Sequence, residues 1–461
     1  MSELLRRRFT FILGLAIVFL TIGRILPAQA VLIPGISGNY QNPPIRIFDL
    51  TAKPGTIATD DGNSIYMWGY ADGNLQMQYP GPSLIINQGD SVTVNLTNKL
   101  PVPVSIVFPG QQGVSVAMVT GTGTLGLLTL EANPGETVQY TFIASQPGTY
   151  TYHSGTRPDL QVEMGLVGAL IVRPTFATPA GFAGCGYGDA ASCFHHEYLH
   201  VLSEIDPQVH LLVQQGRMNE VDNSVATPVY WFINGRAGFD TVAPTNSSFF
   251  PRQPYSGLVR THPEETVLLR IVGATRDLHP HHLHGNHHRV IARDARLLGA
   301  GANLREFAFT TTVGPGQTFD ALFTWTGANL GWDIYGTGAG FDHVCNGLNV
   351  AQAQALRASD PNNAYFATQD PTTREFCADH GKPFPVILPD NKDLLFGPLY
   401  TGSPFLGGTG TLPPGEGGFN PNSGLPFMWH SHSEKELTSN GTFPGGMLTF
   451  CIIEHPSVPI P

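Results

Sequence analysis

Residues 81–98 indicate the fold class of this chain most directly, and they read Gly81-Pro-Ser-Leu-Ile-Ile-Asn-Gln-Gly-Asp-Ser-Val-Thr-Val-Asn-Leu-Thr-Asn98. Two runs within them, 83–87 and 91–96, alternate apolar and polar residues or are rich in β-branched residues, as half-buried strands are. Similar runs follow at 102–107 and 137–142, and turn residues separate them. Short strands spaced in this way predict an all-β sandwich or barrel.

The composition agrees with an all-β fold and limits the kind of partner. Gly (53) and Pro (38) account for 91 of the 461 residues, whereas charged residues make up only 13%. Such a chain suits many turns and buried strand faces, and its length predicts two or three domains. The formal net charge of −11 argues against a nucleic-acid partner.

The N-terminus has the features of an export signal over residues 1–30. Arg6, Arg7 and Arg8 precede an apolar run, and Ala28-Gln-Ala30 has the pattern of a cleavage site. The apolar run is too short for a comfortable membrane span. The arginines fit both the twin-arginine pattern and an ordinary secretory signal, so the export route stays open. The mature protein is expected to be periplasmic or secreted, with no membrane span.

Four of the five cysteines suggest two disulfides, which an oxidising compartment would allow. Cys185 and Cys193 flank a short Gly-rich loop, and Cys345 and Cys377 lie in one irregular region. Cys451 lies in an apolar, strand-like run and is expected to be a buried free thiol.

The strand pattern shows one β-rich region at about 45–172 and another that begins at about 197, and we expect each to be one domain. The first is expected at 31–174 and the second at 195–461, with a Pro-, Gly- and Ala-rich linker at 175–194. Periodicity fades at about 327–426, which we expect to be a long Gly- and Pro-rich insertion containing one short helix at 350–357.

Two motifs match known functional signatures but lie in unsuitable local structure. Gly121-Thr-Gly-Thr-Leu-Gly126 matches the dinucleotide fingerprint, yet strand and turn residues follow it where that fingerprint needs a helix. His196-Glu-Tyr-Leu-His200 matches the zinc-protease signature, which needs both histidines on one helix face. The flanking residues favour a strand, on which the two histidines would be more than about 13 Å apart.

Histidines are concentrated at three places, and this distribution favours a metal site. Six of the 17 fall within His279-Pro-His-His-Leu-His-Gly-Asn-His-His288, His430-Ser-His432 lies near the C-terminus, and His153 ends a strand-like run. On a strand, His-x-His places two imidazoles on one face about 7 Å apart. Since imidazole is a preferred donor for copper, these clusters predict a copper site.

Four blocks of the sequence resemble the multicopper oxidase family, the laccase-like cupredoxin proteins. The resemblance implies tandem cupredoxin-like Greek-key β-sandwich domains, with copper as the cofactor. In the family, four His-x-His pairs hold a trinuclear copper cluster that reduces oxygen to water. A type 1 copper, held by Cys, two His and often Met, takes electrons from the substrate. The blocks span most of the mature chain: 81–98; Tyr152-His-Ser154 with 161–172; 266–272 with His279-Pro-His-His-Leu-His-Gly285; and His430-Ser-His432 with Pro444-Gly-Gly-Met447.

Five of the eight trinuclear ligands carry over onto this sequence. The first pair is missing because Val107 and Pro109 stand at its positions, and the second pair has Gly155 in place of one histidine. The third and fourth pairs are complete. The resemblance therefore implies these metal ligands: His153, His282, His284, His430 and His432.

The type 1 site implied by the resemblance is less complete. His279 is in place, but Ser431 stands at the cysteine position and Glu436 at the second histidine, while Met447 resembles the axial ligand. Without a thiolate, no blue copper chromophore is expected. Glu434 and Glu436 are expected to bind the metal, to orient a histidine, or to lie on a solvated loop. The other histidines of the dense cluster are expected to be exposed or to support ligands: His281, His287 and His288.

The resemblance implies an exported copper-binding protein of the multicopper oxidase type. It would be a copper-dependent oxidoreductase with a diminished, His-ligated centre that uses a small-molecule reductant and oxygen. The alternative is a non-catalytic protein for copper storage, delivery or interaction. In two-domain family members the copper cluster forms between the subunits of a trimer, so a homotrimer is an open expectation.

Overall fold

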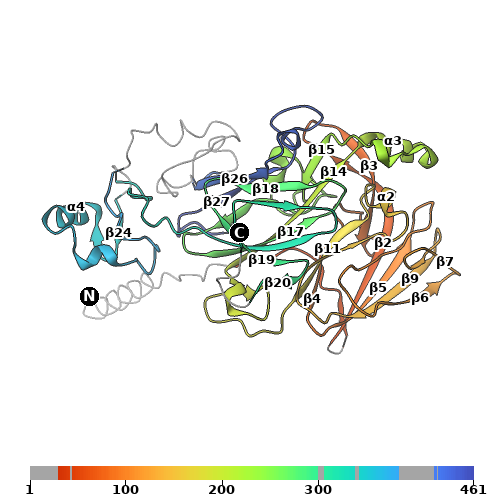
Figure 1. Cartoon of the computed structure of the whole chain (residues 1–461), viewed down its shortest axis with the longest axis horizontal. Coiled ribbons are helices and arrows are strands. Elements are labelled where there is room, and N and C mark those ends of the chain that lie inside the picture. The colour runs from red at the N-terminus through yellow and green to blue at the C-terminus, as the bar shows by residue number, and fades with distance from the viewer. Residues whose placement is uncertain are drawn as a thin grey trace, which may run out of the picture.

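The computed structural model of the chain describes residues 30–41, 44–299, 306–337, 342–383, 420–422 and 424–460. All but the last residue of the expected export signal lies outside these ranges. So do residues 384–419 of the expected insertion. The described part is mostly strand, which confirms the all-β prediction (Figure 1).

Strands between residues 39 and 173 form the first sandwich. The larger sheet has the order β1-β2-β5-β9-β6, with β3 paired to β2, and the smaller has the order β10-β11-β4. Val94 on β5 and Tyr140 on β9 pack against Tyr152 on β10 and Leu170 on β11 in one core. The bounds are β1 (Asn39–Gln41), β2 (Ile45–Ala58), β3 (Ser64–Asp72), β4 (Leu84–Asn87), β5 (Ser91–Asn98), β6 (Ser115–Thr120), β7 (Thr124–Leu125), β8 (Leu130–Glu131), β9 (Thr137–Ile143), β10 (Gly148–His153) and β11 (Val167–Arg173).

Strands between residues 196 and 453 form the second sandwich. One sheet has the order β15-β14-β17-β23-β19-β20, with β21 paired to β19, and the other has the order β16-β27-β26-β18-β22. Leu269 and Phe323 of the first sheet pack against Leu283, Trp429 and Cys451 of the second. The bounds are β14 (His196–Ile205), β15 (Tyr230–Ile233), β16 (Val259–Thr261), β17 (Thr266–Gly273), β18 (His279–Leu283), β19 (His288–Arg293), β20 (Arg296–Leu297), β21 (Glu306–Ala308), β22 (Thr310–Val313), β23 (Thr318–Thr324), β26 (Leu425–Ser431) and β27 (Leu448–Ile453).

Helices are short and lie outside the sheets. They are α2 (Pro158–Gln161), α3 (Pro207–Gln214) and α4 (Val350–Ser359), with 3-10 turns η1 (Ala190–Ser192), η2 (Met218–Glu220), η3 (Asn223–Val225), η4 (Gly238–Val242), η6 (Ala364–Ala367) and η7 (Glu434–Leu437). Within the described ranges, none of the helices combines the length and apolar character that a membrane crossing requires.

A buried polar network joins the two sandwiches. Arg270 on β17 is fully buried and contacts Glu197 (2.8 Å) and Asp320 (3.4 Å). It also donates to Thr149 Oγ1 on β10 of the first sandwich (2.9 Å), and Thr149 in turn donates to Asp320 (2.5 Å). The two domains are therefore held in register by paired charges as well as by apolar packing.

Part of the segment that we expected to be a linker, residues 184–194, forms an ordered hairpin. Strands β12 (Gly184–Cys185) and β13 (Cys193–Phe194) pair, and the predicted disulfide joins Cys185 to Cys193. The Tyr187 hydroxyl donates to Asp320 in the buried network. A Gly- and Pro-rich composition predicted looseness here, but the disulfide and this tyrosine fix the segment onto the second sandwich.

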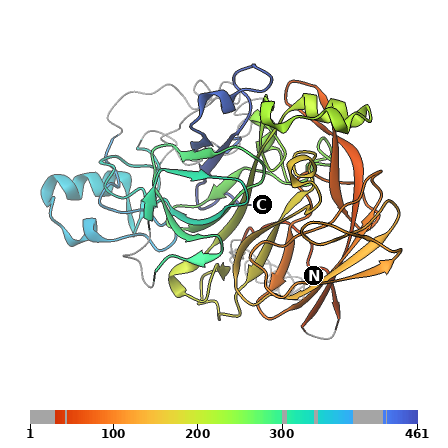
Figure 2. The same ribbon diagram turned by 45° about the vertical axis from the view of Figure 1, so that its right-hand side comes forward.

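The described part of the insertion forms a small lobe at one end of the molecule, away from the first sandwich (Figures 1 and 2). Strands β24 (Val344–Cys345) and β25 (Leu348–Asn349) lead into α4, which agrees with the predicted helix at 350–357. Asn349 caps α4 in a capping box with Gln352. The second predicted disulfide, Cys345–Cys377, closes the lobe, and Cys451 is a buried free thiol as predicted.

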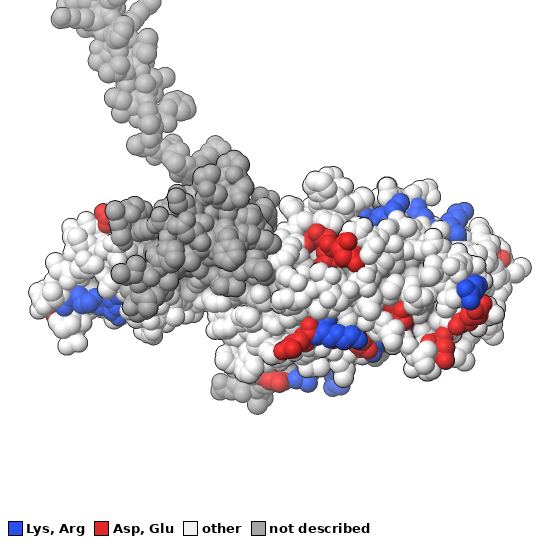
Figure 3. All heavy atoms as spheres, turned by 90° about the horizontal axis from the view of Figure 1, so that it is seen from above, with Lys and Arg blue, Asp and Glu red and all other residues white. Residues whose placement is uncertain are grey.

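Charged side chains are sparse on the surface, as the composition predicts. On the face in Figure 3 they form small groups of both signs, separated by uncharged residues.

Candidate metal centre

Two adjacent antiparallel strands carry the candidate metal ligands. β18 pairs with β26 so that His282 lies directly opposite His430. His284 continues from the end of β18, and His432 from the end of β26. Because side chains alternate along a strand, each His-x-His pair places both rings on the same face.

The four imidazoles form one cluster. Ring centroids are 4.6 Å apart for His282 and His432, 4.7 Å for His284 and His430, and 5.5 Å for His282 and His430. The Nε2 atoms of His284 and His430 are only 2.8 Å apart. Nitrogen donors from His282, His284 and His430 lie within 4.8 Å of one another, close enough to share an ion.

The environment favours the neutral rings of His282, His284 and His430. Burial, with the neighbouring histidines, lowers the pKa of His430 to about 4, and burial also lowers the pKa of His282 and His284. His430 Nδ1 lies 2.5 Å from the Ser431 carbonyl oxygen, so Nδ1–H donates to it and Nε2 keeps a lone pair toward the cluster. His282 Nδ1 contacts Thr310 Oγ1 (2.8 Å), which leaves its Nε2 for a metal. The donor set fits copper, because neutral imidazole is a preferred copper ligand.

His153, the fifth predicted ligand, is not brought to this cluster within one chain. None of the described hydrogen bonds or ring contacts joins it to the four imidazoles. It lines a cavity of about 290 Å³ between the two domains, with Arg276 and Pro315 on the other side. Its Nδ1 contacts the Ser154 carbonyl oxygen (3.0 Å).

Other side chains fill the space beside Gly155, where the family has a histidine. A Cβ atom added at Gly155 would lie 2.7 Å from Val107 Cγ1 and 3.0 Å from Ser105 Oγ. Val107 pairs through its backbone with His153. The apolar Val107 side chain thus fills the space that a histidine at 155 would need.

The type 1 position holds an ion triad. His279 is fully buried, and its Nδ1 and Nε2 lie 2.9 Å from Glu436 and 3.0 Å from Glu204. Burial alone would favour the neutral ring, but the two carboxylates outweigh it and raise the pKa of His279 to about 9. Both ring nitrogens therefore donate hydrogen bonds at neutral pH, and neither has a lone pair for a metal.

The remaining residues of the implied type 1 site serve the packing around this triad. Ser431 Oγ accepts from the Ser433 backbone (3.2 Å), and the Ser431 N–H donates to the Met447 carbonyl oxygen (3.0 Å). The Met447 side chain is buried in the apolar core of the second sandwich. Of the two glutamates considered, Glu436 orients a histidine, whereas Glu434 is exposed.

Of the three histidines expected to be exposed or to support ligands, two are not exposed. His281 and His288 are fully buried. His281 alternates with the ligand His282 along β18, whereas His288 begins β19 in the other sheet of the sandwich. His281 Nε2 lies 2.9 Å from His200 Nδ1, and His288 Nε2 lies 2.6 Å from Thr311 Oγ1. His287 is exposed.

The protease-like motif lies on strand β14, as its flanking residues predicted. His196 contacts Glu265 (2.7 Å), while His200 contacts the Gly257 carbonyl oxygen and His281. The two histidines therefore have different partners and do not share a site. The glycines at 121–126 likewise lie in a loop and short strand β7 with no helix after them.

Sequence reasoning missed Glu204, the second carboxylate of the triad. A signal was present, because Glu204 is the one charged residue among Val201, Leu202, Ser203 and Ile205 at the end of a strand-like run. A charge in such a strand needs a partner, but the sequence does not say which one.

Comparisons with known proteins show which proteins the chain is similar to. Residues 52–176 match the multicopper oxidase family model. The chain is 38% identical over 109 residues to multicopper oxidase MCE of Talaromyces pinophilus, covering 23% of this chain and 17% of that protein. It is 29% identical over 274 residues to L-ascorbate oxidase of Cucurbita pepo var. melopepo, covering 54% and 43%. The chain thus spans less than half the length of these curated relatives.

A solved structure extends the likeness to nearly the whole chain. The blue copper oxidase from Nitrosomonas europaea matches with a TM-score of 0.52 at 17% identity, over 89% of this chain and 86% of that one. At this identity the match shows a shared fold. Over residues 52–176 the chain thus matches the multicopper oxidase family, whose cofactor is copper, and over nearly its whole length it shares the fold of a blue copper oxidase.

Proposed function

We propose that this protein is an exported copper protein whose copper is held by His282, His284, His430 and His432 and that has no type 1 copper. The observation that carries the proposal is the cluster itself, in which neutral imidazoles from two paired strands approach to 2.8 Å between nitrogens. Neutral imidazoles in such a cluster match copper in donor type and in number.

The residues around the cluster would orient the ligands. The Ser431 carbonyl and Thr310 hydroxyl fix the His430 and His282 rings, so that Nε2 of each is directed to the metal. His284 and His432 are exposed, which gives small molecules access to this face. Bound copper would supply one-electron chemistry with a small-molecule reductant and oxygen.

The ion triad supports the absence of a type 1 copper. Glu204 and Glu436 occupy both nitrogens of His279, and Ser431 offers no thiolate. Electrons would then have to reach the histidine cluster directly, from a reductant that contacts its exposed side. This restriction separates the proposed activity from that of a laccase.

We also propose that His153 of a second copy completes the centre in a homotrimer. Within one chain His153 lines a separate cavity, whereas the exposed side of the histidine cluster is open to a neighbouring subunit. The sequence features of residues 1–30 support export to the periplasm or the medium.

Copper content and oxygen consumption test this function. Purified protein reconstituted with copper should retain it through dialysis, and His282→Ala with His430→Ala should lose most of it, because removing two of four ligands leaves too few. His196→Ala, whose ring lies in a separate contact network, is the matched control and should keep its copper. Retained copper in the double variant would contradict the proposal.

Oxygen uptake with excess reductant then separates the two functional alternatives. Turnover that disappears with the copper in the double variant indicates an oxidoreductase. Stable copper binding without oxygen uptake indicates storage or delivery on the same site.

A further inference from the structure

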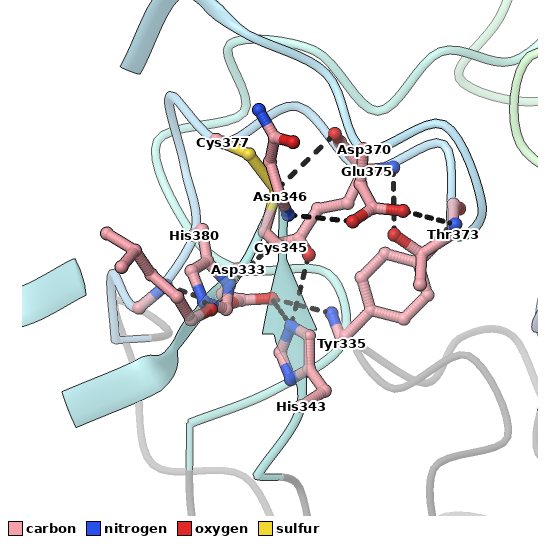
Figure 4. A network of polar contacts seen from close by, with 12 residues as sticks. Asp333, Tyr335, His343, Cys345, Asn346, Asp370, Thr373, Glu375, Cys377 and His380 are labelled. Carbon is pink, nitrogen blue, oxygen red and sulfur yellow. Dashed lines mark hydrogen bonds and ion pairs between the residues drawn. A yellow bond between two sulfur atoms is a disulfide. The ribbon is translucent and has the colours of Figure 1, made fainter. Parts of the chain in front are cut away.

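The inserted lobe contains a second set of metal-ligating side chains, separate from the histidine cluster. Asp333 lies before β24 in the sequence, and His343 immediately precedes that strand. Glu375 and His380 come from the chain after α4 (Figure 4). One ligand atom from each of the four lies within 4.8 Å of the others. Two imidazoles and two carboxylates thus converge from distant points of the lobe.

The four groups are removed from solvent. The exposed fraction is 2% for Asp333, 3% for Glu375 and 0% for His380. The side chain of His343 is 16% exposed. Two carboxylates buried this deeply require a matching positive charge.

Hydrogen bonds from the backbone aim the ligand atoms at one another. His380 Nε2 lies 3.0 Å from the Leu348 carbonyl oxygen, so Nε2–H donates to it and Nδ1 faces Asp333 (3.3 Å) and Glu375 (2.9 Å). Asp333 is itself fixed, because it accepts from the backbone N–H groups of Tyr335 (2.9 Å) and Gly381 (2.7 Å). A neutral His380 would point its Nδ1 lone pair at two carboxylates, so a positive charge is needed there, either a bound cation or a proton on Nδ1.

One carboxylate oxygen in the cluster has no hydrogen bond. Glu375 Oε2 is buried and accepts none from the described residues. It lies 3.3 Å from His343 Nε2, which is also 3.4 Å from Asp333 Oδ1. These separations exceed those of good N–H···O bonds but suit atoms arranged around a common ion.

We propose that Asp333, His343, Glu375 and His380 bind one zinc ion that stabilises the inserted lobe. Two His nitrogens and two carboxylate oxygens make a four-coordinate set of the kind that zinc accepts, and no position is left open for catalysis. The Nε2–H of His380 donated to a carbonyl is the usual support of a zinc-bound imidazole.

The lobe has few buried apolar residues, so a bound metal ion would add to its stability. Of α4 only Val350 and Ala353 are buried, so the lobe has little apolar core of its own. The disulfide Cys345–Cys377 lies two residues from both His343 and Glu375 in sequence. Small units with small cores are commonly held by a disulfide, a metal or both.

Two protons could supply the positive charge instead of zinc, and the experiment must distinguish them. Burial alone would lower the pKa of both imidazoles, but the neighbouring carboxylates of Asp333 and Glu375 raise the pKa of His343 to about 10 and that of His380 to about 9. Without a metal the cluster would therefore be a network of two imidazoliums and two carboxylates.

Zinc per chain, measured by mass spectrometry after loading with zinc chloride and dialysis against metal-free buffer, tests the proposal. The wild type should retain zinc. The double variant Glu375→Gln, His380→Asn should retain less zinc per chain by a factor of more than about ten. Asp379→Asn is the matched control, since Asp379 is a buried acid beside the cluster that pairs with Lys382. It should keep the zinc, and so should His282→Ala with His430→Ala.

Equal zinc in the wild type and the Glu375→Gln, His380→Asn variant would overturn the proposal, as would a wild type that retains none. Circular dichroism and Tm show whether the variant is folded. If it is not, anomalous scattering at the zinc edge from crystals of the loaded wild type decides the matter. A peak among the four side chains supports the site, and its absence there refutes it.

Discussion

Replacing His279 with glutamine should destabilise the protein by about 3 kcal/mol at pH 7. The pKa of His279 rises from 6.5 to about 9 in the folded chain, because Glu204 and Glu436 accept hydrogen bonds from both ring nitrogens. At 1.36 kcal/mol per pKa unit, this rise corresponds to about 3 kcal/mol of stability. Removing the central cation of a buried ion pair costs about 3–5 kcal/mol in comparable cases.

The pH dependence of this contribution has a definite sign. A group whose pKa is raised by folding contributes fully below its unfolded pKa of 6.5, and the contribution is lost as the pH rises through 9. Urea unfolding of the wild type and His279→Gln should therefore give free energies that differ by about 3 kcal/mol at pH 6 and converge near pH 10. His287→Gln, at an exposed position, is the control and should follow the wild type. A constant difference across this range would refute the imidazolium assignment.

Three further outcomes are expected. The copper-loaded protein should be pale, without the intense absorption of a thiolate–copper bond in its visible spectrum, because only imidazoles bind the metal; an intensely blue solution would contradict the proposed ligands. Ser431→Cys alone should not restore oxidation of phenols, because Glu436 still occupies a nitrogen of His279, and a spectrophotometric assay with a phenol would show any recovery. Arg270→Met should lower the free energy of unfolding by about 3–5 kcal/mol in urea titrations, because it leaves Asp320 and Glu197 in a buried interface without their shared cation.

Several expectations failed where the sequence signal was only local. Gly- and Pro-rich composition predicted a loose linker at 175–194, but a disulfide and a hydrogen bond from Tyr187 to a distant strand order it. His281 and His288 were expected to be exposed or to support ligands, and exposure is wrong for both. Strand alternation turns His281 inward toward His200, and His288 is buried at the start of another strand, where it contacts Thr311.

The sequence by itself determined the all-β class, the two disulfides and the ligand candidates on β18 and β26. Each of these rests on short-range features: side-chain alternation along a strand, cysteine spacing, and the His-x-His period that puts two rings on one face. Such patterns survive in the folded chain because neighbouring residues stay neighbours.

Only the tertiary structure decided which charges meet. Glu204 and Glu436 reach His279 from positions 75 residues before and 157 residues after it, and Asp333 and His380 are 47 residues apart. These contacts depend on sheet order and on a disulfide that closes the lobe, neither of which has a local signature. A charged residue in an apolar run predicts that the folded chain supplies a partner for the charge. Which residue is that partner depends on the path of the backbone in three dimensions.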